Sequence, residues 1–291
     1  MRIGRALSST WLLFLLVGEL LARWRHGGDL PPATVRPRGL VVDPGTECPV
    51  LVVLGDSIPA GYGLGDPQTS WPVHLGHLLA RGGTPYRVVD AGIPGETSVQ
   101  GWARWHRDVS PWHPRYVLIA FGLNDGHLAH TSVDDWRWAH LPQGIGRYVR
   151  LIHLWRVHRL PLPREDARTL APRLTPAQTA QVMHLLIHRA RRSGAMPVLL
   201  TPTPITDLFH PEWPDAIRAY QRDVYSRTAA AIRQVARREA VPLADMNKLM
   251  CPPQEAWYQP DGIHLSPEGH AHYAERVYTH LFAQKYAWRF P

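Results

Sequence analysis

The sequence lacks the features that mark several classes of protein. It has only two cysteines, Cys48 and Cys251, in 291 residues. Cys48 precedes the first predicted strand, and Cys251 falls near loops at the opposite edge of the predicted sheet, so we expect two free thiols. There is no His-Glu-x-x-His motif, no glycine-rich phosphate loop, no dinucleotide fingerprint and no internal repeat. We therefore expect neither a metal nor a cofactor.

Acidic residues are outnumbered by basic ones. The chain has 24 Asp and Glu against 32 Lys and Arg, which gives a formal net charge of +8. This balance, carried largely by arginine, suits an anionic partner such as a phospholipid surface or an acidic wall polymer, and it equally suits plain solubility. No helix-turn-helix, zinc-finger or RNA-binding signature accompanies the charge, so we expect no nucleic-acid partner. The sequence leaves the oligomeric state open.

Long apolar stretches are also scarce. Residues 6–22 contain no Lys or Arg and lie between Arg5 and Arg23, but Glu19 interrupts them. This length fits a signal-peptide core and is marginal for crossing a bilayer. We expect residues 1–25 to be a signal or anchor segment, which predicts a periplasmic or extracellular protein. An amphipathic helix packed on the domain is the alternative.

Glycine and proline are concentrated in residues 26–47, which we expect to be a linker to a catalytic domain over residues 48–291. In that domain, short apolar runs alternate with helical patterns. The predicted strands are residues 50–54, 86–89, 116–121, 196–201 and 241–245, and helices are expected to begin near Ser70, Thr97, Thr175, Pro214 and Ser266. This alternation predicts a three-layer α/β/α sandwich around a five-stranded parallel sheet.

A candidate nucleophile follows the first predicted strand. Gly55-Asp56-Ser57 comes directly after the apolar run Val50 to Leu54 and turns the chain at the carboxyl edge of the sheet. Open α/β sheets keep their sites at that edge. A serine hydroxyl is a poor nucleophile near neutral pH, so it needs a base, and the base needs a third group to orient it.

Other parts of the chain supply those groups. His264 is a candidate base, and Asp261, three residues earlier, can orient it. Asn124 follows the strand that ends at Phe121, and Gly95 lies in the loop after the strand that ends at Val89. The backbone N–H groups of Ser57 and Gly95 and the side-chain amide of Asn124 can form an oxyanion hole, because donors fixed at developing charge stabilise a tetrahedral intermediate.

These motifs, taken in order, resemble those of the GDSL-type or SGNH hydrolases, a family of esterases, lipases, thioesterases and carbohydrate deacetylases. The resemblance implies the flavodoxin-like SGNH fold, a triad of Ser57, His264 and Asp261, and an oxyanion hole of Ser57, Gly95 and Asn124. Ile58 stands where the family name has leucine, which keeps an apolar side chain there. The matching segments are Val53 to Ser57, Ala91 to Thr97, Gly122 to Asp125 and Asp261 to His270.

The favoured function is a serine carboxylic-ester hydrolase that acts on a small or lipid-like acyl ester. A carbohydrate or cell-wall O-acetylesterase and a thioesterase remain alternatives with the same groups. In another class, the chain can be a non-catalytic lipid- or polymer-binding module, although a binder has no need of all five site residues. We expect Asp56 and Asp125 to brace their loops through hydrogen bonds, and we assign no catalytic role to Asp90.

Residues 127–172 interrupt the alternation of strands and helices. They are rich in tryptophan and arginine, and residues 145–160 have the pattern of a basic amphipathic helix. Such a helix can rest on an anionic membrane or cover an acyl-binding pocket, so we expect the insertion to shape substrate access. A peripheral helix with a solvated basic face is the alternative.

Overall fold

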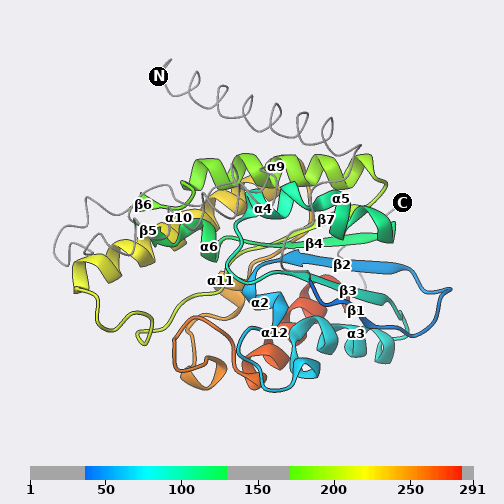
Figure 1. Ribbon diagram of the computed structural model, residues 1–291, viewed down its shortest axis with the longest axis horizontal. Helices are drawn as coiled ribbons and strands as arrows, with labels where there is room; N and C mark the ends of the chain where they lie inside the picture. The colour runs from blue at the N-terminus through cyan, green and yellow to red at the C-terminus, as the bar shows by residue number, and fades with distance from the viewer. Residues whose placement is uncertain (1–36, 130–170, 284–291) are drawn as a thin grey trace, which may run out of the picture.

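The computed structural model describes residues 37–129 and 171–283. The predicted signal or anchor segment (residues 1–25) and most of the insertion (residues 127–172) lie outside these ranges. A six-stranded sheet forms the middle layer, in the order β1-β3-β2-β4-β7-β8 (Figure 1). Its strands are β1 (Gly39–Val42), β2 (Val50–Gly55), β3 (Arg87–Gly92), β4 (Tyr116–Ala120), β7 (Met196–Leu200) and β8 (Leu243–Ala244).

Five of these strands are parallel and coincide with the five predicted ones, but the sheet has a sixth strand. Residues 39–42, which lie in the predicted linker, instead form β1 and pair with β3 in the antiparallel direction, with Gly39 opposite Asp90. The flanking prolines and glycines suggested a linker there. Leu40, Val41 and Val42 nevertheless pack against the core, and the Val42 side chain lies over Gly76.

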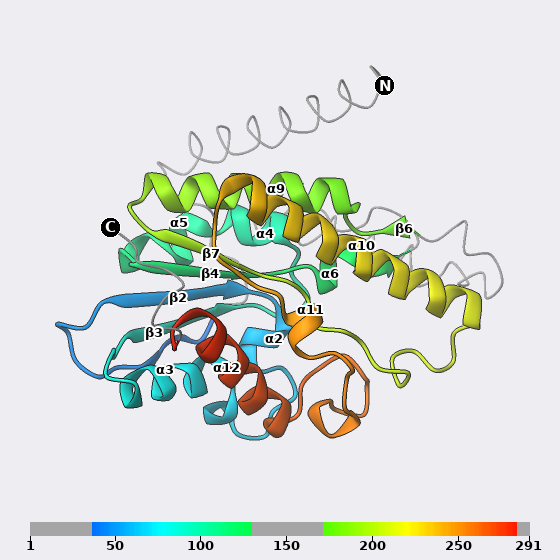
Figure 2. The ribbon, with the colours of Figure 1, turned by 180° about the vertical axis from the view of Figure 1, so that it is seen from behind.

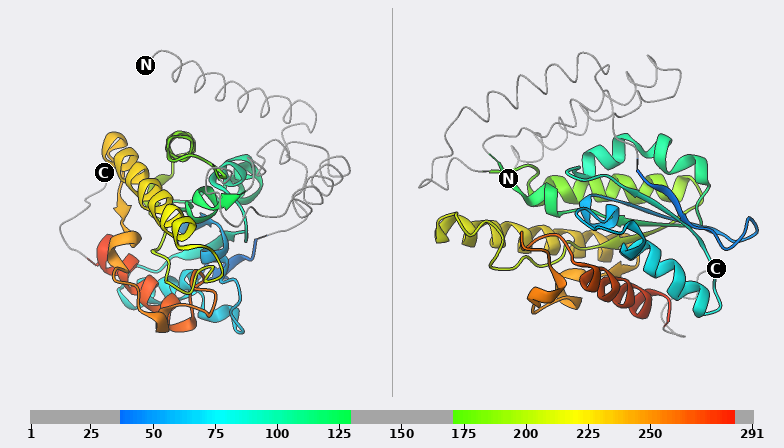
Figure 3. Two further views of the ribbon diagram at one scale, coloured as in Figure 1. Left: turned by 90° about the vertical axis from the view of Figure 1, so that its left-hand side faces the viewer. Right: turned by 60° about the horizontal axis from the view of Figure 1, so that its bottom comes forward.

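Helices cover both faces of the sheet (Figures 1 and 2), as the predicted α/β/α sandwich requires. Figure 3 shows α3 and α12 packed together on one side. Within residues 37–129 and 171–283, no helix has the length and apolar character needed to cross a membrane. One layer contains α2 (Ser57–Ala60), α3 (Trp71–Arg81) and α12 (Pro267–Leu281), and the other α4 (Ser98–Ala103), α5 (Trp105–Asp108), α9 (Pro176–Arg192) and α10 (Asp215–Glu239).

Three short elements complete the site edge: α6 (Leu123–Gly126) and the two-stranded ribbon of β5 (Leu128–Ala129) and β6 (Ala171–Pro172). A further short helix, α11 (Met246–Leu249), follows β8. In the described part of the chain, 3₁₀ turns lie at Pro67–Thr69, Ser110–Trp112 and Glu255–Trp257. Cys48 and Cys251 are free thiols, as expected.

The sheet is buried on both faces, which explains why its strands read as continuous apolar runs. Along β2, Val52 and Leu54 belong to one hydrophobic cluster, whereas Leu51 and Val53 belong to the cluster on the opposite face. Successive side chains of a strand point to opposite faces, so each strand contributes to both clusters.

Local capping fixes where the main helices begin. The Thr175 hydroxyl accepts a hydrogen bond from the Gln178 backbone N–H at 3.3 Å, and the Ser266 hydroxyl accepts one from the Gly269 N–H at 3.1 Å. Each bond satisfies a backbone donor that the first helical turn leaves without a partner. Ser70 also precedes a helix, but its hydroxyl accepts from Arg38 instead of capping α3.

A buried histidine joins the first turns of α3 and α12. The Trp71 backbone N–H donates to Nδ1 of His270 at 3.2 Å, which requires that nitrogen to be unprotonated. Burial lowers the pKa of His270 to about 3, and Coulomb interactions with His74, His264 and Arg38 add to the effect. The neutral ring is therefore part of the folded structure.

His270 should make the protein sensitive to acid. The folded protein binds fewer protons at this site than the unfolded chain does, so the stability that His270 contributes is present above its unfolded pKa and is lost as the pH falls towards the folded pKa. Between about pH 7.5 and 5.5 this loss should reach about 1.4 kcal/mol. His270→Asn keeps an acceptor for Trp71 and removes the titration, so its free energy of unfolding should change less over that interval.

Urea unfolding of both proteins at the two pH values measures this difference. Burial raises the pKa of Asp56 and Asp90 to about 7, which acts in the opposite direction, but these groups are present in both proteins. His77→Asn, at an exposed position of α3, should behave like the wild type. An equal pH dependence in the wild type and His270→Asn would contradict the assignment.

Candidate active site

Ser57 lies at the start of α2, immediately after β2. Its side chain is only 7% exposed. The Asp56 carboxylate accepts a hydrogen bond from the Ile58 backbone N–H at 3.1 Å, which fixes the turn on which Ser57 stands. The helix then ends after one turn at Gly61, whose φ of +66° is a left-handed conformation that favours glycine.

His264 and Asp261 meet Ser57 from a loop that precedes α12. Nε2 of His264 lies 3.1 Å from the Ser57 hydroxyl, and Nδ1 of His264 lies 2.6 Å from a carboxylate oxygen of Asp261. The other oxygen of Asp261 accepts from the His264 backbone N–H at 3.0 Å. These contacts form a continuous chain of hydrogen bonds from carboxylate to imidazole to hydroxyl among the three residues proposed from the sequence.

The loop that carries the imidazole is held on two sides. Gly262 has a φ of +71°, and a Cβ there would come within 2.5 Å of the Phe209 backbone nitrogen, so no larger residue fits without a shift. On the other side, the Gln259 side-chain amide donates to the carbonyl oxygens of Tyr62 at 2.8 Å and Leu265 at 2.9 Å. The Tyr62 ring lies against the His264 ring, with their centroids 4.7 Å apart.

The two acidic residues of the site have opposite electrostatic environments. Partial burial alone would raise the pKa of Asp261, but hydrogen bonds from the His264 ring and from the backbone N–H groups of His264 and Ile263 hold that pKa below its usual value. Asp261 is therefore a carboxylate at neutral pH. Burial raises the pKa of Asp56 to about 7, and the nearby Asp125 carboxyl adds to that shift.

The strand register brings the three loops of the predicted oxyanion hole to one edge. Gly55 at the end of β2 is opposite Gly92 of β3 and Ala120 of β4. Ser57 lies two residues after Gly55, Gly95 lies three residues after Gly92, and Asn124 lies four residues after Ala120. Gly95 has a φ of +80°, and an added Cβ would meet no atom within 4 Å, so conformation and not space favours glycine there.

Arg173 joins two of these loops. One guanidinium nitrogen donates to the side-chain oxygen of Asn124 at 3.1 Å, and another donates to the carbonyl oxygen of Gly95 at 2.8 Å. Because the oxygen of the Asn124 amide is occupied by this contact, its NH₂ group is left to face another acceptor. Asp125, the next residue, accepts from the backbone N–H and hydroxyl of Ser98 at 2.8 and 2.7 Å.

Arg173 is the principal site residue that sequence analysis missed. It follows the insertion directly and belongs to no motif that the sequence shows. Burial lowers its pKa to about 10, although Asp125, Tyr225 and Asp56 oppose the shift, so the guanidinium remains charged at neutral pH. The backbone N–H of Arg173 donates to the His127 carbonyl oxygen at 3.0 Å beside the β5-β6 ribbon, which fixes its place.

A second arginine, Arg104, connects the end of β2, just before Ser57, to the Gly95 loop. Its guanidinium donates to the Gly55 carbonyl oxygen at 2.9 Å and forms buried ion pairs with Glu96 at 2.5 Å and Asp108 at 2.8 Å. Such a group is costly to bury unless its hydrogen bonds are satisfied. Here the satisfied charges hold the backbone on either side of the site.

Two exposed apolar side chains lie beside the loop that carries His264. Among the described residues, the large hydrophobic side chains that are exposed are Tyr62, at 54%, and Leu208, at 39%. Tyr62 touches the His264 ring, and Leu208 is next to the backbone that packs against Gly262. Single apolar side chains scattered over a protein surface do not indicate a binding site, but these two flank the same loop.

A family comparison agrees with this geometry. The model of the GDSL-like Lipase/Acylhydrolase family matches residues 53–272, which is more than half of the chain. The chain belongs to this family. The match begins in β2, just before Ser57, and ends in α12, beyond His264, so it includes every element that contributes to the arrangement described above.

Individual relatives of this GDSL-like chain match a shorter stretch. Esterase TesA of Pseudomonas aeruginosa is 45% identical over 76 residues, which is 26% of this chain and 37% of that protein. Thioesterase 1/protease 1/lysophospholipase L1 of Escherichia coli is 40% identical over 76 residues, or 26% of this chain and 35% of that protein. The chain thus spans little more than a third of either relative.

Several solved structures resemble this GDSL-like chain over most of its length. The crystal structure of TesA has a TM-score of 0.55 and 25% identity, and covers 80% of this chain and 98% of that one. LAE5, from the metagenome of Lake Arreo, has a TM-score of 0.51 and 26% identity, with coverage of 79% and 94%. Axe2, an acetylxylan esterase from Geobacillus stearothermophilus, has a TM-score of 0.52 at 20% identity, which supports the fold alone.

Proposed function

We propose that this protein is a serine carboxylic-ester hydrolase in which Ser57 is the nucleophile, His264 the base and Asp261 its orienting carboxylate. The observation that carries the proposal is the unbroken hydrogen-bond chain, with 3.1 Å between Ser57 and His264 and 2.6 Å between His264 and Asp261. A serine becomes an effective nucleophile when a base lies within hydrogen-bond distance and a third group holds that base.

The reaction follows from the positions of these groups. His264 takes the proton of Ser57 as the hydroxyl oxygen attacks the carbonyl carbon of the ester, and a tetrahedral oxyanion forms. The backbone N–H groups of Ser57 and Gly95 and the amide of Asn124 stabilise that charge. His264 then protonates the leaving alcohol. Water then attacks the acyl-enzyme while His264 takes its proton. His264 returns that proton to the Ser57 oxygen as the acid leaves, which restores the enzyme.

The substrate class that fits best is an ester with an apolar acyl chain. Tyr62 and Leu208 expose apolar surface on either side of the His264 loop, where a chain leaving the reacting carbonyl can be covered. The names of the relatives include esterase, thioesterase and lysophospholipase, which fits such a substrate. A thioester with the same acyl chain presents the same carbonyl to the site.

We infer an exported protein from residues 1–25, and a net charge of +8 suits an anionic lipid surface.

Hydrolysis of a graded panel of substrates tests this function. The full chain should hydrolyse p-nitrophenyl esters, with kcat/KM higher for acyl chains of six to twelve carbons than for acetate, and higher than for acetylated xylose. Matched acyl-coenzyme A thioesters test the thioesterase alternative. A fluorophosphonate probe should label Ser57 covalently, because only an activated serine reacts.

The possible outcomes separate the classes of protein. Absence of both hydrolysis and labelling would indicate the non-catalytic binding module. Labelling together with a preference for acetylated sugars would retain the reaction but replace the apolar acyl chain by a carbohydrate O-acetyl ester.

A further inference from the structure

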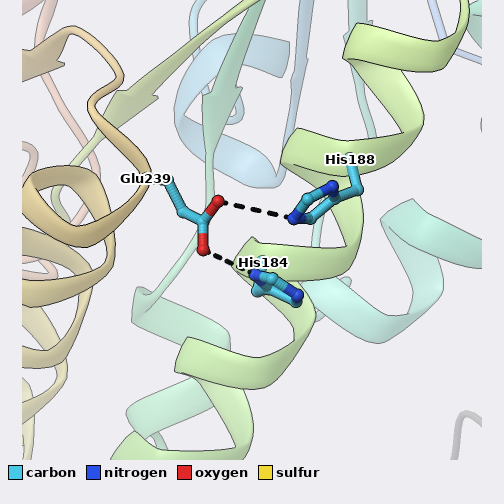
Figure 4. Close-up of side chains that lie close together, drawn as sticks. All are labelled: His184, His188 and Glu239. Carbon is cyan, nitrogen blue, oxygen red and sulfur yellow. Dashed lines mark hydrogen bonds and ion pairs between the residues drawn. The ribbon is translucent and has the colours of Figure 1, made fainter.

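A second cluster of reactive side chains lies in the helical layer of α9 and α10. His184 and His188 are one turn apart on α9, and Glu239 is the last residue of α10 (Figure 4). Nδ1 of His184 is 2.8 Å from one carboxylate oxygen of Glu239, and Nε2 of His188 is 3.4 Å from the other. Nothing in the proposed ester hydrolysis uses these three residues.

The three side chains have the composition of a metal site. Two imidazoles and one carboxylate are the protein ligands of many zinc centres, with a water molecule in the fourth position. Their ligand atoms all lie within 4.8 Å of one another, and within residues 37–129 and 171–283 no other cluster of three His, Cys, Asp or Glu side chains meets this criterion. Ligand atoms around a tetrahedral zinc are roughly 3.3 Å apart, so small side-chain rotations bring them into place.

Rigid backbone positions the three ligands. Histidines four residues apart on a helix share one face, and the ring centroids of His184 and His188 are 4.2 Å apart. The Arg191 guanidinium donates to the backbone carbonyl oxygen of Glu239 at 2.5 Å, which fixes the end of α10 on α9. Glu239 is only 11% exposed, whereas His184 and His188 are 41% and 44% exposed, so an ion can reach the imidazoles from solvent.

The positive neighbours of Glu239 are compatible with a bound ion. Arg191 lies 3.4 Å from one carboxylate oxygen, and Arg238 lies 3.4 Å from the other. Both contacts are longer than an ideal charge-assisted hydrogen bond, so the carboxylate keeps lone pairs available. Carboxylates that bind metals commonly accept hydrogen bonds from surrounding groups, which hold them in orientation.

From these contacts we infer that His184, His188 and Glu239 form a binding site for one zinc-class divalent cation that connects α9 to the end of α10. The cation replaces the direct contacts of the histidines with Glu239 by three coordination bonds. The site is structural, since none of its residues contacts Ser57, His264 or Asp261.

Zinc titration of the full chain, free of any polyhistidine tag and stripped by a chelator, tests the inference. Calorimetry at pH 7.5 should find one zinc ion per chain, and zinc should raise the melting temperature. Cobalt should give the intense visible absorption of tetrahedral coordination. Because each ligand supplies a coordination bond, Glu239→Gln and His188→Ala should each weaken zinc binding by about 10-fold or more. His77→Ala, which removes an exposed histidine of α3, should leave binding unchanged.

The two variants also distinguish this site from the proposed hydrolase site. Both should retain the ester hydrolysis of the wild type, whatever that activity is. Absence of a zinc-dependent melting shift at tenfold excess zinc would overturn the inference, and so would zinc binding of wild-type strength in both variants. Glu239→Gln keeps the size of the side chain, so a loss of binding there cannot be ascribed to unfolding if its melting temperature without zinc matches the wild type.

Discussion

Ser57→Ala should lower kcat for ester hydrolysis by at least about 10⁴-fold, because in the proposed mechanism it removes the atom that forms the covalent bond with the acyl group. The remaining rate comes from the oxyanion donors and from substrate binding. KM should change little, since the Ser57 side chain is small and its hydroxyl makes its hydrogen bond with His264. Steady-state kinetics with a p-nitrophenyl ester measure the effect, and fluorophosphonate labelling should disappear.

Two controls make this result interpretable. Ser193→Ala removes another serine hydroxyl, which donates to the Ala190 carbonyl oxygen at the end of α9, and it should keep full activity. Ser57→Ala should unfold in denaturant at the same concentration as the wild type. Activity within about 10-fold of the wild type would refute the role of Ser57 as nucleophile.

Arg173→Met should lower kcat by about 10- to 100-fold with little change in KM, because removing an oxyanion donor outright costs about 10²- to 10³-fold. The guanidinium holds the Asn124 amide and the Gly95 loop at once. Without it, both can leave the orientation that the proposed oxyanion hole requires. Arg173→Lys should recover part of the loss, since it keeps the positive charge but has a single nitrogen to serve two acceptors.

A double-mutant cycle separates positioning from a general loss of charge. If Arg173 acts through Asn124, the combined effect of Arg173→Met and Asn124→Ala should be smaller than the product of the single effects. Arg222→Met removes an arginine that pairs with the exposed Asp207, and it should leave kcat unchanged. Equal losses in Arg222→Met and Arg173→Met would show that net charge matters and position does not.

The sequence was most informative where local signals agreed with each other. The five parallel strands are continuous apolar runs because both faces of the sheet are covered, and the starts of α9 and α12 are marked by Thr175 and Ser266, which cap them. The contacts among Ser57, His264 and Asp261 were also predictable, because the three residues stand in short motifs whose order is typical of the family.

The rest could not be predicted because it depends on contacts between distant residues. Arg173 reaches Asn124 across 49 positions of sequence, and nothing near it suggests a role in the site. Strand β1 depends on its pairing with β3 and on its contacts with α3, both of which are distant in sequence. His184 and His188 have the spacing of any helical surface pair, and their relation to Glu239 emerges only when α10 packs on α9.

The β5-β6 ribbon has a consequence for changes of length in the interval between its two strands. Ala129 and Ala171 are paired across the ribbon, so the two ends of the interval of 41 residues between them lie next to each other. Closing a longer or shorter loop between fixed ends changes the free energy only slowly with length. Insertions and deletions in this interval should therefore leave Asn124 and Arg173 in place, because the paired strands hold the ends of the interval together.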